Sequence, residues 1–225
     1  MKLCVTLECG DTFTENEWEL YLFPNEKEAD TNDLVVSSGM TIQELCEALE
    51  MGKNVLLLGA EPFASLPTTF QMALAGRTSG NLATVVSDHP ALEKLPHEGF
   101  CGWQFRRLLE GGSAVCFETD EVPFDPIIEV VSTHKFAIRQ AALFEFSALN
   151  GKLLVCSFSF LHSDPAARWL KNRLIQYAQS DSFDPAHSLS QKQLYALAES
   201  KVVHTAGNTN FAFNANDKTA NRRKK

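Results

Sequence analysis

The sequence lacks the long apolar runs that mark a membrane protein. Its longest apolar stretches, such as residues 55–58 and 141–144, fall far short of the ~20 residues that cross a bilayer. Residues 1–10 also lack the charged and then apolar pattern of an export leader. We therefore expect no membrane partner and a cytoplasmic location.

Paired cysteines are also missing. The chain has six cysteines, and no two of them stand at C-x-x-C spacing, so the pattern predicts neither a zinc site nor a disulfide scaffold. Cys116 and Cys156 lie in apolar, strand-like runs, where a cysteine behaves as a small hydrophobic residue. We expect reduced, buried thiols and no bound metal.

Basic residues are scarce over most of the chain. The net charge is -8, and residues 1–50 contain twelve acids but only Lys2 and Lys27 as bases. Binding to phosphates requires a basic face, so nucleic acid is not an expected partner. Residues 201–225 carry six bases and one acid, and their polar, Asn-rich composition predicts a disordered, solvated tail.

The apolar pattern predicts an α/β domain. Thr41 and Glu44 form a capping-box pattern, and apolar residues at helical spacing follow, which predicts a helix over residues 41–51. Short apolar strands at residues 34–36 and 54–58 flank this helix. A strand, a helix and a strand in so few residues indicate two parallel strands joined by a crossover.

The remaining strands and helices follow from alternation, turn residues and caps. We expect further strands at residues 3–7, 18–23, 82–86, 114–117 and 127–131, a helix at residues 103–110 and a short helix at residues 190–200. Asn150-Gly151 separates two apolar runs and predicts a hairpin with a type I′ turn at the edge of the sheet. Asp164-Pro165 predicts the start of a helix.

Reactive groups for catalysis are not found in a recognisable pattern. The turn at residues 59–62 has one glycine, an acid and a proline, unlike a phosphate-binding loop. No G-x-S-x-G or G-x-C-x-G elbow exists. We therefore assign no catalytic residue and no cofactor, and the alternative is an amidotransferase-like hydrolase that would use Cys46, Cys156 or His162.

Three aromatic or amide side chains and one acid are candidates for substrate binding. Trp103 and Gln104 place an aromatic face beside an amide, which suits a sugar ring, and Trp18 begins a predicted strand. Glu145 lies inside the apolar string Leu-Phe-Glu-Phe, and alternation predicts that it points outward. Other acids, such as Glu118 and Glu129, have no spacing that places two of them in one cleft.

Several strings in order resemble the C-terminal α/β domain of bacterial family 2 glycoside hydrolases of the β-galactosidase type. The strings are Asn16-Glu17-Trp18-Glu19-Leu20 with Phe23-Pro24, His89-Pro90-Ala91-Leu92, Trp103-Gln104-Phe105, Pro126-Ile127-Ile128-Glu129-Val130, Leu143-Phe144-Glu145, Gly151-Lys152-Leu153-Leu154-Val155-Cys156 and Asp164-Pro165-Ala166-Ala167-Arg168. They span about residues 16–185. Phe105 departs from the pattern, since relatives often have a second tryptophan there, and this weakens the case for a sugar platform.

The resemblance implies a fold, a domain division and a role. The fold would be a three-layer, flavodoxin-like (class I glutamine amidotransferase-like) α/β domain over residues 16–185, with a mixed, mainly parallel sheet. Residues 1–15 would be the end of a preceding β-sandwich, and residues 186–225 a short helix and the tail.

The implied role is that of a non-catalytic accessory domain of a family 2 glycoside hydrolase. Its partners would be the β-sandwich and barrel domains of that enzyme, and a carbohydrate is a further candidate partner. The family's catalytic glutamates lie on a barrel of ~250 residues, which this chain is too short to contain, so no catalytic glutamate is carried over. The alternatives are the amidotransferase-like hydrolase and a stand-alone carbohydrate-binding module.

Overall fold

The computed structural model describes residues 1–70, 83–131, 138–160 and 164–200. The expected disordered tail, His162 of the alternative hydrolase and residue 82 of one expected strand lie outside these residues. The strands are β1 (Lys2–Cys9), β2 (Thr12–Glu19), β3 (Val35–Ser37), β4 (Asn54–Leu57), β5 (Ser65–Pro67), β6 (Ala83–Val86), β7 (Ser113–Cys116), β8 (Ile128–Val131), β9 (Gln140–Ala148), β10 (Gly151–Cys156) and β11 (Ser188–Leu189). The helices are α1 (Ile42–Glu50), η1 (Pro90–Leu92), η2 (Trp103–Phe105), α2 (Arg106–Leu109), α3 (Pro165–Ala178) and α4 (Gln191–Ala198).

The body of the molecule is built on one mixed sheet of nine described strands. The central path is β3-β4-β10-β9-β7-β5, with β11 and β8 pairing with β9, and β6 pairing with β8. Strand β9 is therefore the hub of the sheet. Seven of its nine residues are buried because both of its faces are covered, as in a central strand.

The prediction of a three-layer, flavodoxin-like fold with a mainly parallel sheet is wrong. Of the eight pairings in the described part of the sheet, five are antiparallel. The predicted parallel pair of β3 and β4 around α1 is confirmed, but this unit is not repeated among the described elements. Between residues 58 and 140 the described helices are short, and a parallel crossover usually needs a longer one.

The predicted hairpin at Asn150-Gly151 is confirmed, but its place and its turn differ from the prediction. β9 and β10 lie in the middle of the sheet, not at its edge. The two turn residues are Leu149 and Asn150, because Gly151 already pairs with Ala148, and Leu149 has φ 55. A Cβ at position 151 would lie 2.2 Å from the Lys53 carbonyl oxygen, so glycine is needed for close packing there.

Two apolar clusters fill the space on the two faces of the sheet. One lies against α3, α2 and η1 and includes Leu143, Leu154 and Leu170. The other lies against α1 and α4 and includes Phe117, Phe144 and Leu49. The capping box of α1 and the Asp164-Pro165 start of α3 are both confirmed.

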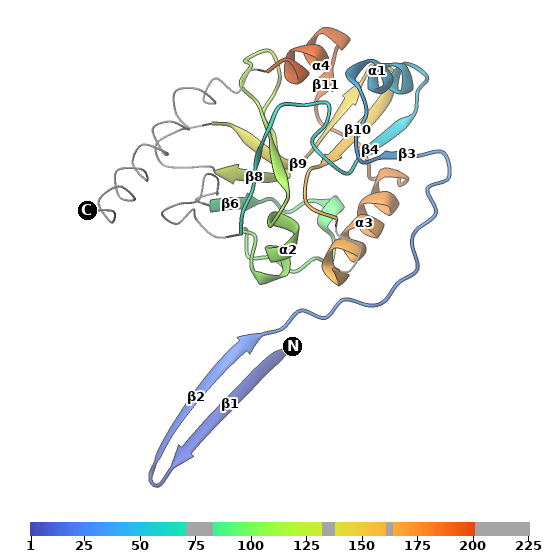
Figure 1. The fold of residues 1–225 in the computed structure, drawn as a ribbon. Coiled ribbons are helices and arrows are strands. Elements are labelled where there is room, and N and C mark those ends of the chain that lie inside the picture. Colours follow the sequence, from blue (N-terminus) through green and yellow to red (C-terminus); the bar gives the residue numbers. More distant parts are fainter. Residues whose placement is uncertain (71–82, 132–137, 161–163, 201–225) are drawn as a thin grey trace, which may run out of the picture.

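The first 19 residues stand apart from this body (Figure 1). Strands β1 and β2 form a separate two-stranded antiparallel sheet, which extends away from the rest of the molecule (Figure 1). We call β1 and β2 the hairpin and residues 20–33, which join it to the body, the strap. The expected strand at residues 18–23 is wrong, since β2 ends at Glu19 and the strap has no regular secondary structure.

Candidate functional site

The hairpin has one apolar face. Every residue of both strands is exposed, and residues directly opposite each other share a face. The register pairs Leu3 with Trp18, Val5 with Asn16 and Leu7 with Thr14. Side chains alternate along a strand, so this face comprises Leu3, Val5, Leu7 and Cys9 of β1 and Thr12, Thr14, Asn16 and Trp18 of β2. We call it the apolar face after the β1 row and Trp18; the other three β2 residues are polar.

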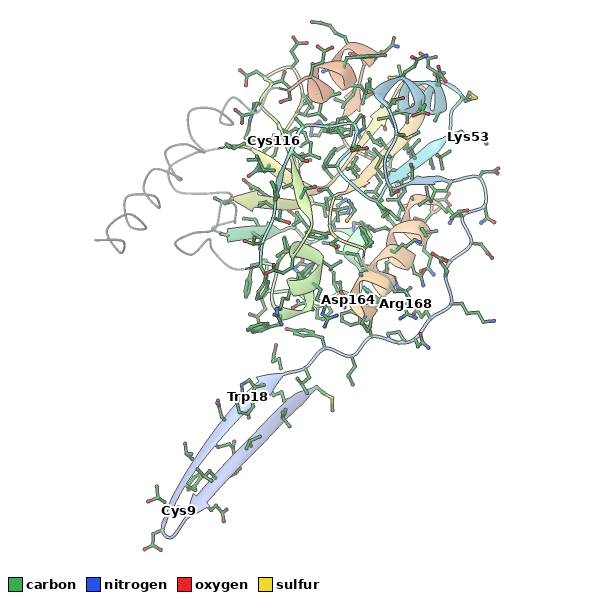
Figure 2. The ribbon with its side chains drawn as sticks, in the orientation of Figure 1. Cys9, Trp18, Lys53, Cys116, Asp164 and Arg168 are labelled. Carbon is green, nitrogen blue, oxygen red and sulfur yellow. The ribbon has the colours of Figure 1, made fainter. Side chains whose placement is uncertain are left out.

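These apolar side chains have no cover in the described part of the chain. Leu7 is 66% exposed and Trp18 is 46% exposed. Figure 2 shows Trp18 near the base of the hairpin and Cys9 at its far end. An isolated two-stranded hairpin is only marginally stable in water, and contiguous exposed apolar surface marks an interaction site. The apolar face of the hairpin is therefore the first candidate functional surface.

The opposite face of the hairpin is acidic. It comprises Lys2, Cys4, Thr6, Glu8, Phe13, Glu15, Glu17 and Glu19. Its side chains bond to each other across the strands: the Lys2 ammonium lies 2.9 Å from Glu17, and the Thr6 hydroxyl donates to Glu15 at 3.3 Å. Burying charged groups without full pairing costs free energy, so this face is stable in contact with water.

The strap fastens the hairpin to α3 of the body. The buried side chain of Asn172 donates to the Lys27 carbonyl at 2.8 Å and accepts from the Ala29 backbone N–H at 3.0 Å. This amide satisfies the strap backbone as a neighbouring strand would. The Phe23 ring also packs on Trp169, with 5.7 Å between centroids.

Charged and polar side chains along α3 continue this attachment. Arg173 pairs with Glu26 at 2.6 Å, Lys171 pairs with Glu28, and Arg168 donates to Asn25 at 2.7 Å. The strap thus contacts successive turns of one helix. These contacts fix the strap on the body and so set the point from which the hairpin leaves it.

A second candidate is a small acid–base cluster on the α3 side of the sheet. Glu145 in β9 accepts a hydrogen bond from the Tyr177 hydroxyl at 2.8 Å. The Nε2 atom of His89 lies 3.7 Å from the other Glu145 oxygen. The His89 ring meets the Tyr177 ring edge to face, with 5.6 Å between centroids. Its Nδ1 accepts from the Ala91 N–H at 3.2 Å, so the proton of the neutral ring is on Nε2, facing Glu145.

Burial shifts the pKa of each member of this cluster. It raises the pKa of Glu145, which the Tyr177 hydroxyl and the Lys152 ammonium oppose. It also raises the pKa of Tyr177, and the neighbouring Glu145 carboxylate adds to this shift. It lowers the pKa of His89, which the charge of Asp125 opposes. These shifts favour a neutral phenol and a neutral imidazole near neutral pH, while burial works against the charge of Glu145 and the Tyr177 hydroxyl stabilises it.

The outward orientation predicted for Glu145 is wrong. Its side chain is only 9% exposed, because both faces of β9 are covered and Glu145 shares the α3 face with Leu143. Tyr177 lies three residues after Leu174 on the buried side of α3, and a hydroxyl in that position indicates a buried polar partner. The sequence prediction missed both His89 and Tyr177.

Trp103 and Gln104 are neighbours that face different surroundings. Trp103 is 64% exposed and packs on the Phe70 ring, with 5.0 Å between centroids. Gln104 is buried and donates to the Pro96 carbonyl, so its amide is not beside the exposed Trp103 face. The four predicted substrate-binding residues therefore lie at three separate places: the hairpin, η2 and β9.

The thiols of the alternative hydrolase are buried. Cys46 lies in α1 and Cys156 in β10, and burial raises the pKa of Cys46 and raises that of Cys156 to about 12. A nucleophilic cysteine needs a lowered pKa and access to its substrate. Only Cys4 and Cys9, both on the hairpin, are exposed.

Two further findings concern the described residues. They hold no group of three or more His, Cys, Asp or Glu side chains placed to bind a metal ion. None of their helices has the length and apolar content to span a membrane.

A comparison with protein families matches residues 38–199 to the domain of unknown function DUF8487. The chain belongs to this family. The DUF8487 region begins directly after β3 and contains α1–α4 and the rest of the large sheet. The hairpin and the strap lie outside it. A search of curated proteins finds no match.

Proposed function

We propose that this chain is a non-catalytic accessory domain that attaches to a sugar hydrolase of the family 2 type. The observation that carries the proposal is the hairpin, whose apolar side chains are 46–66% exposed and have no cover among the described residues. Burying a large apolar side chain contributes roughly 1.5–3 kcal/mol. Leu3, Leu7 and Trp18 together therefore offer a substantial gain to any partner that covers them.

The strap supports the same role. An accessory domain that positions or stabilises an enzyme needs a defined attachment, and the strap is bound along α3 by Asn172, Arg173 and Lys171. Because the strap is bound to α3, a partner that binds the hairpin would be attached to the DUF8487 body at a defined point. The choice of a family 2 enzyme as the partner rests on the motif resemblance to the C-terminal domain of those enzymes.

The buried acid–base cluster fits a structural role. Glu145 is bound to Tyr177 and packed under His89, and a carboxylate used in this way stabilises the contact of α3 with the sheet. Each of the three side chains contacts another member of the cluster, so the protonation states of the cluster affect the stability of the fold. We therefore assign these three side chains to stability.

The test uses a family 2 β-galactosidase that keeps its sandwich and barrel domains but lacks its own C-terminal α/β domain. We expect the purified chain to bind this truncated enzyme and to raise its thermal stability and its turnover of nitrophenyl galactoside. Absence of binding would contradict the proposal. Hydrolysis by the chain alone that is lost in Glu145→Gln, with Glu118→Gln and Glu129→Gln tested beside it, would contradict its non-catalytic part.

A second candidate function is carbohydrate binding on Trp103. Its exposed ring, supported from behind by Phe70, has the form of a stacking surface for a sugar ring. Titration with galacto-oligosaccharides should then change tryptophan fluorescence in the wild type and in Trp18→Phe but not in Trp103→Phe. An equal response in Trp103→Phe would exclude this site.

A further inference from the structure

We infer that helix α3 is a recognition surface for an extended acidic protein segment, and that the strap is the occupant that this chain supplies itself. The surface consists of Arg168, Trp169, Lys171, Asn172, Arg173 and Gln179. An acidic segment of another protein would bind there in the same way and displace the strap. The inference goes beyond the accessory function and does not rest on it.

The charges of the helix and the strap are complementary. Residues 165–178 of α3 contain three bases and no acid, although the whole chain has a net charge of -8. Residues 20–33 of the strap contain four acids and one base. The side chains of Arg173 and Glu26 are only 26% and 29% exposed, and a partly buried ion pair is screened less than one in open water. A basic helix in an acidic protein favours an acidic ligand.

Side-chain amides of the surface bind the strap through its backbone, which every extended segment also has. Asn172 donates to the Lys27 carbonyl and accepts from the Ala29 N–H. Gln179 donates to the Asp30 carbonyl at 2.9 Å. These bonds satisfy backbone groups as a neighbouring strand would. They do not depend on the side chains of the bound segment.

Side chains at fixed spacing give the surface its selectivity. In an extended segment, residues two apart lie on the same side, and the two acids Glu26 and Glu28 have this spacing. Arg173 pairs with the first acid and Lys171 with the second. Phe23, three residues before the first acid, packs on the tryptophan of the surface. The surface therefore fits the pattern aromatic-x-x-acid-x-acid.

The strap is attached to the body as a ligand is, on the outside of the core. None of residues 20–33 is buried, and Phe23 and Ala29 pack on the core cluster while partly exposed. A segment held mainly by exposed polar contacts opens at a lower free energy than the core. The DUF8487 region starts at residue 38 and contains α3 but not the strap. The surface thus belongs to the family domain, whereas its occupant does not.

A dye-labelled peptide of residues 20–33 is the probe, and fluorescence anisotropy measures its binding to the full-length chain. In the wild type, the tethered strap has an effective concentration on the order of millimolar and competes with the peptide. Glu26→Arg places a cation against Arg173 and should release the strap, so that the peptide binds at least tenfold more tightly than to the wild type.

Asp30→Arg is the matched control. It makes the same change of charge at an exposed strap residue that contacts Gln179 through its backbone carbonyl. We expect peptide binding to stay within twofold of the wild type. Circular dichroism of both strap variants should match that of the wild type, since neither residue is buried.

Three further measurements separate recognition from a general effect on the fold. Arg173→Glu added to Glu26→Arg restores the ion pair with reversed sign, so the strap should again exclude the peptide. In the peptide, Glu26→Gln should weaken binding to the Glu26→Arg chain at least fivefold, and Asp30→Asn less than twofold. A large excess of the unlabelled peptide should also displace the strap of the wild type and speed proteolysis within residues 20–33, which needs no variant.

The outcomes decide between distinct alternatives. Equal peptide binding by the wild type, Glu26→Arg and Asp30→Arg would overturn the inference, and so would strap proteolysis that does not respond to the peptide. A single-stranded oligonucleotide that displaces the peptide at an equal concentration of negative charge would identify a general anion surface and overturn the commitment to a protein segment. None of these measurements involves the truncated β-galactosidase, so the accessory function succeeds or fails separately.

Discussion

Removing one hydroxyl group tests the interpretation of the buried acid–base cluster. Tyr177→Phe deletes the donor that binds Glu145 at 2.8 Å but keeps the ring, which packs edge to face on His89 and lies 5.3 Å from Phe183. Hydrogen bonds to charged groups contribute roughly 1.5–3 kcal/mol. Because Glu145 is almost fully buried, little water can replace the donor. We expect the free energy of unfolding at pH 7.5 to fall by about 2 kcal/mol.

The loss should depend on pH with a defined sign. Burial raises the pKa of Glu145 in the folded protein, so its ionisation costs stability above that pKa, and this cost disappears as the pH falls below the ordinary value. The Tyr177 hydroxyl lowers the pKa of Glu145, so its removal raises that pKa further. The deficit of Tyr177→Phe should therefore be largest near pH 7.5 and should shrink as Glu145 becomes protonated.

Urea unfolding at pH 7.5, 6 and 5, followed by the fluorescence of the buried Trp169, measures this deficit. Tyr21→Phe is the control, because the Tyr21 hydroxyl also donates to a carboxylate, that of Glu19 at 3.0 Å, but on the surface. Exposed interactions of this kind contribute little. The reasoning is refuted if both variants unfold at the same urea concentration, or if the deficit of Tyr177→Phe grows on acidification.

Three further predictions concern the strap, the histidine and the thiols. Asn172→Ala removes two hydrogen bonds to the strap. At roughly 1 kcal/mol each, their loss should destabilise the protein by about 2 kcal/mol and speed protease cleavage within residues 20–33. An unchanged cleavage rate would contradict the anchoring of the strap by Asn172. His89→Asn keeps an acceptor for the Ala91 N–H but cannot titrate. Since burial lowers the pKa of His89, the wild type should lose stability relative to this variant as the pH falls from 7.5 to 5, and parallel pH profiles would refute this. Iodoacetamide at pH 7.5 should modify Cys4 and Cys9 and leave the four buried thiols unmodified until the protein is unfolded; one fast-reacting buried thiol would instead favour the amidotransferase-like alternative.

Local structure was predictable where neighbouring residues determine it. The α1 capping box needs only Thr41 and Glu44, and both of its hydrogen bonds form. The start of α3 follows from Pro165, which fits the first helical position without losing a hydrogen bond. The β9–β10 hairpin follows from two apolar runs joined by a short turn. Each of these features is decided within about ten residues.

Sheet order was not predictable because it depends on contacts far apart in the chain. β9 pairs with β7, β8, β10 and β11, and local alternation carries no information on those partners. The apolar runs of β9 and β10 did indicate strands buried on both faces, which are central strands. That signal contradicts a hairpin at the sheet edge, and it also contradicts an outward-pointing Glu145.

The candidate sites show the same limit. Alternation in residues 3–7 predicted β1, but only the register with β2 shows that Trp18 lies beside Leu3 on one exposed face of the hairpin. Glu145 was singled out by its unusual neighbours in the sequence. Its partners His89 and Tyr177 come from segments 56 and 32 residues away, so no local pattern could connect them.

Hydrogen exchange of the hairpin amides tests the central claim most directly. Among the described residues nothing covers either face of β1 and β2, so in the free chain their amides should exchange fast while those of β9 and β10 exchange slowly. In the complex with the truncated β-galactosidase, exchange in residues 2–19 should slow by at least tenfold and that of the DUF8487 core should stay the same. Hairpin amides that exchange equally fast with and without that enzyme would contradict the account.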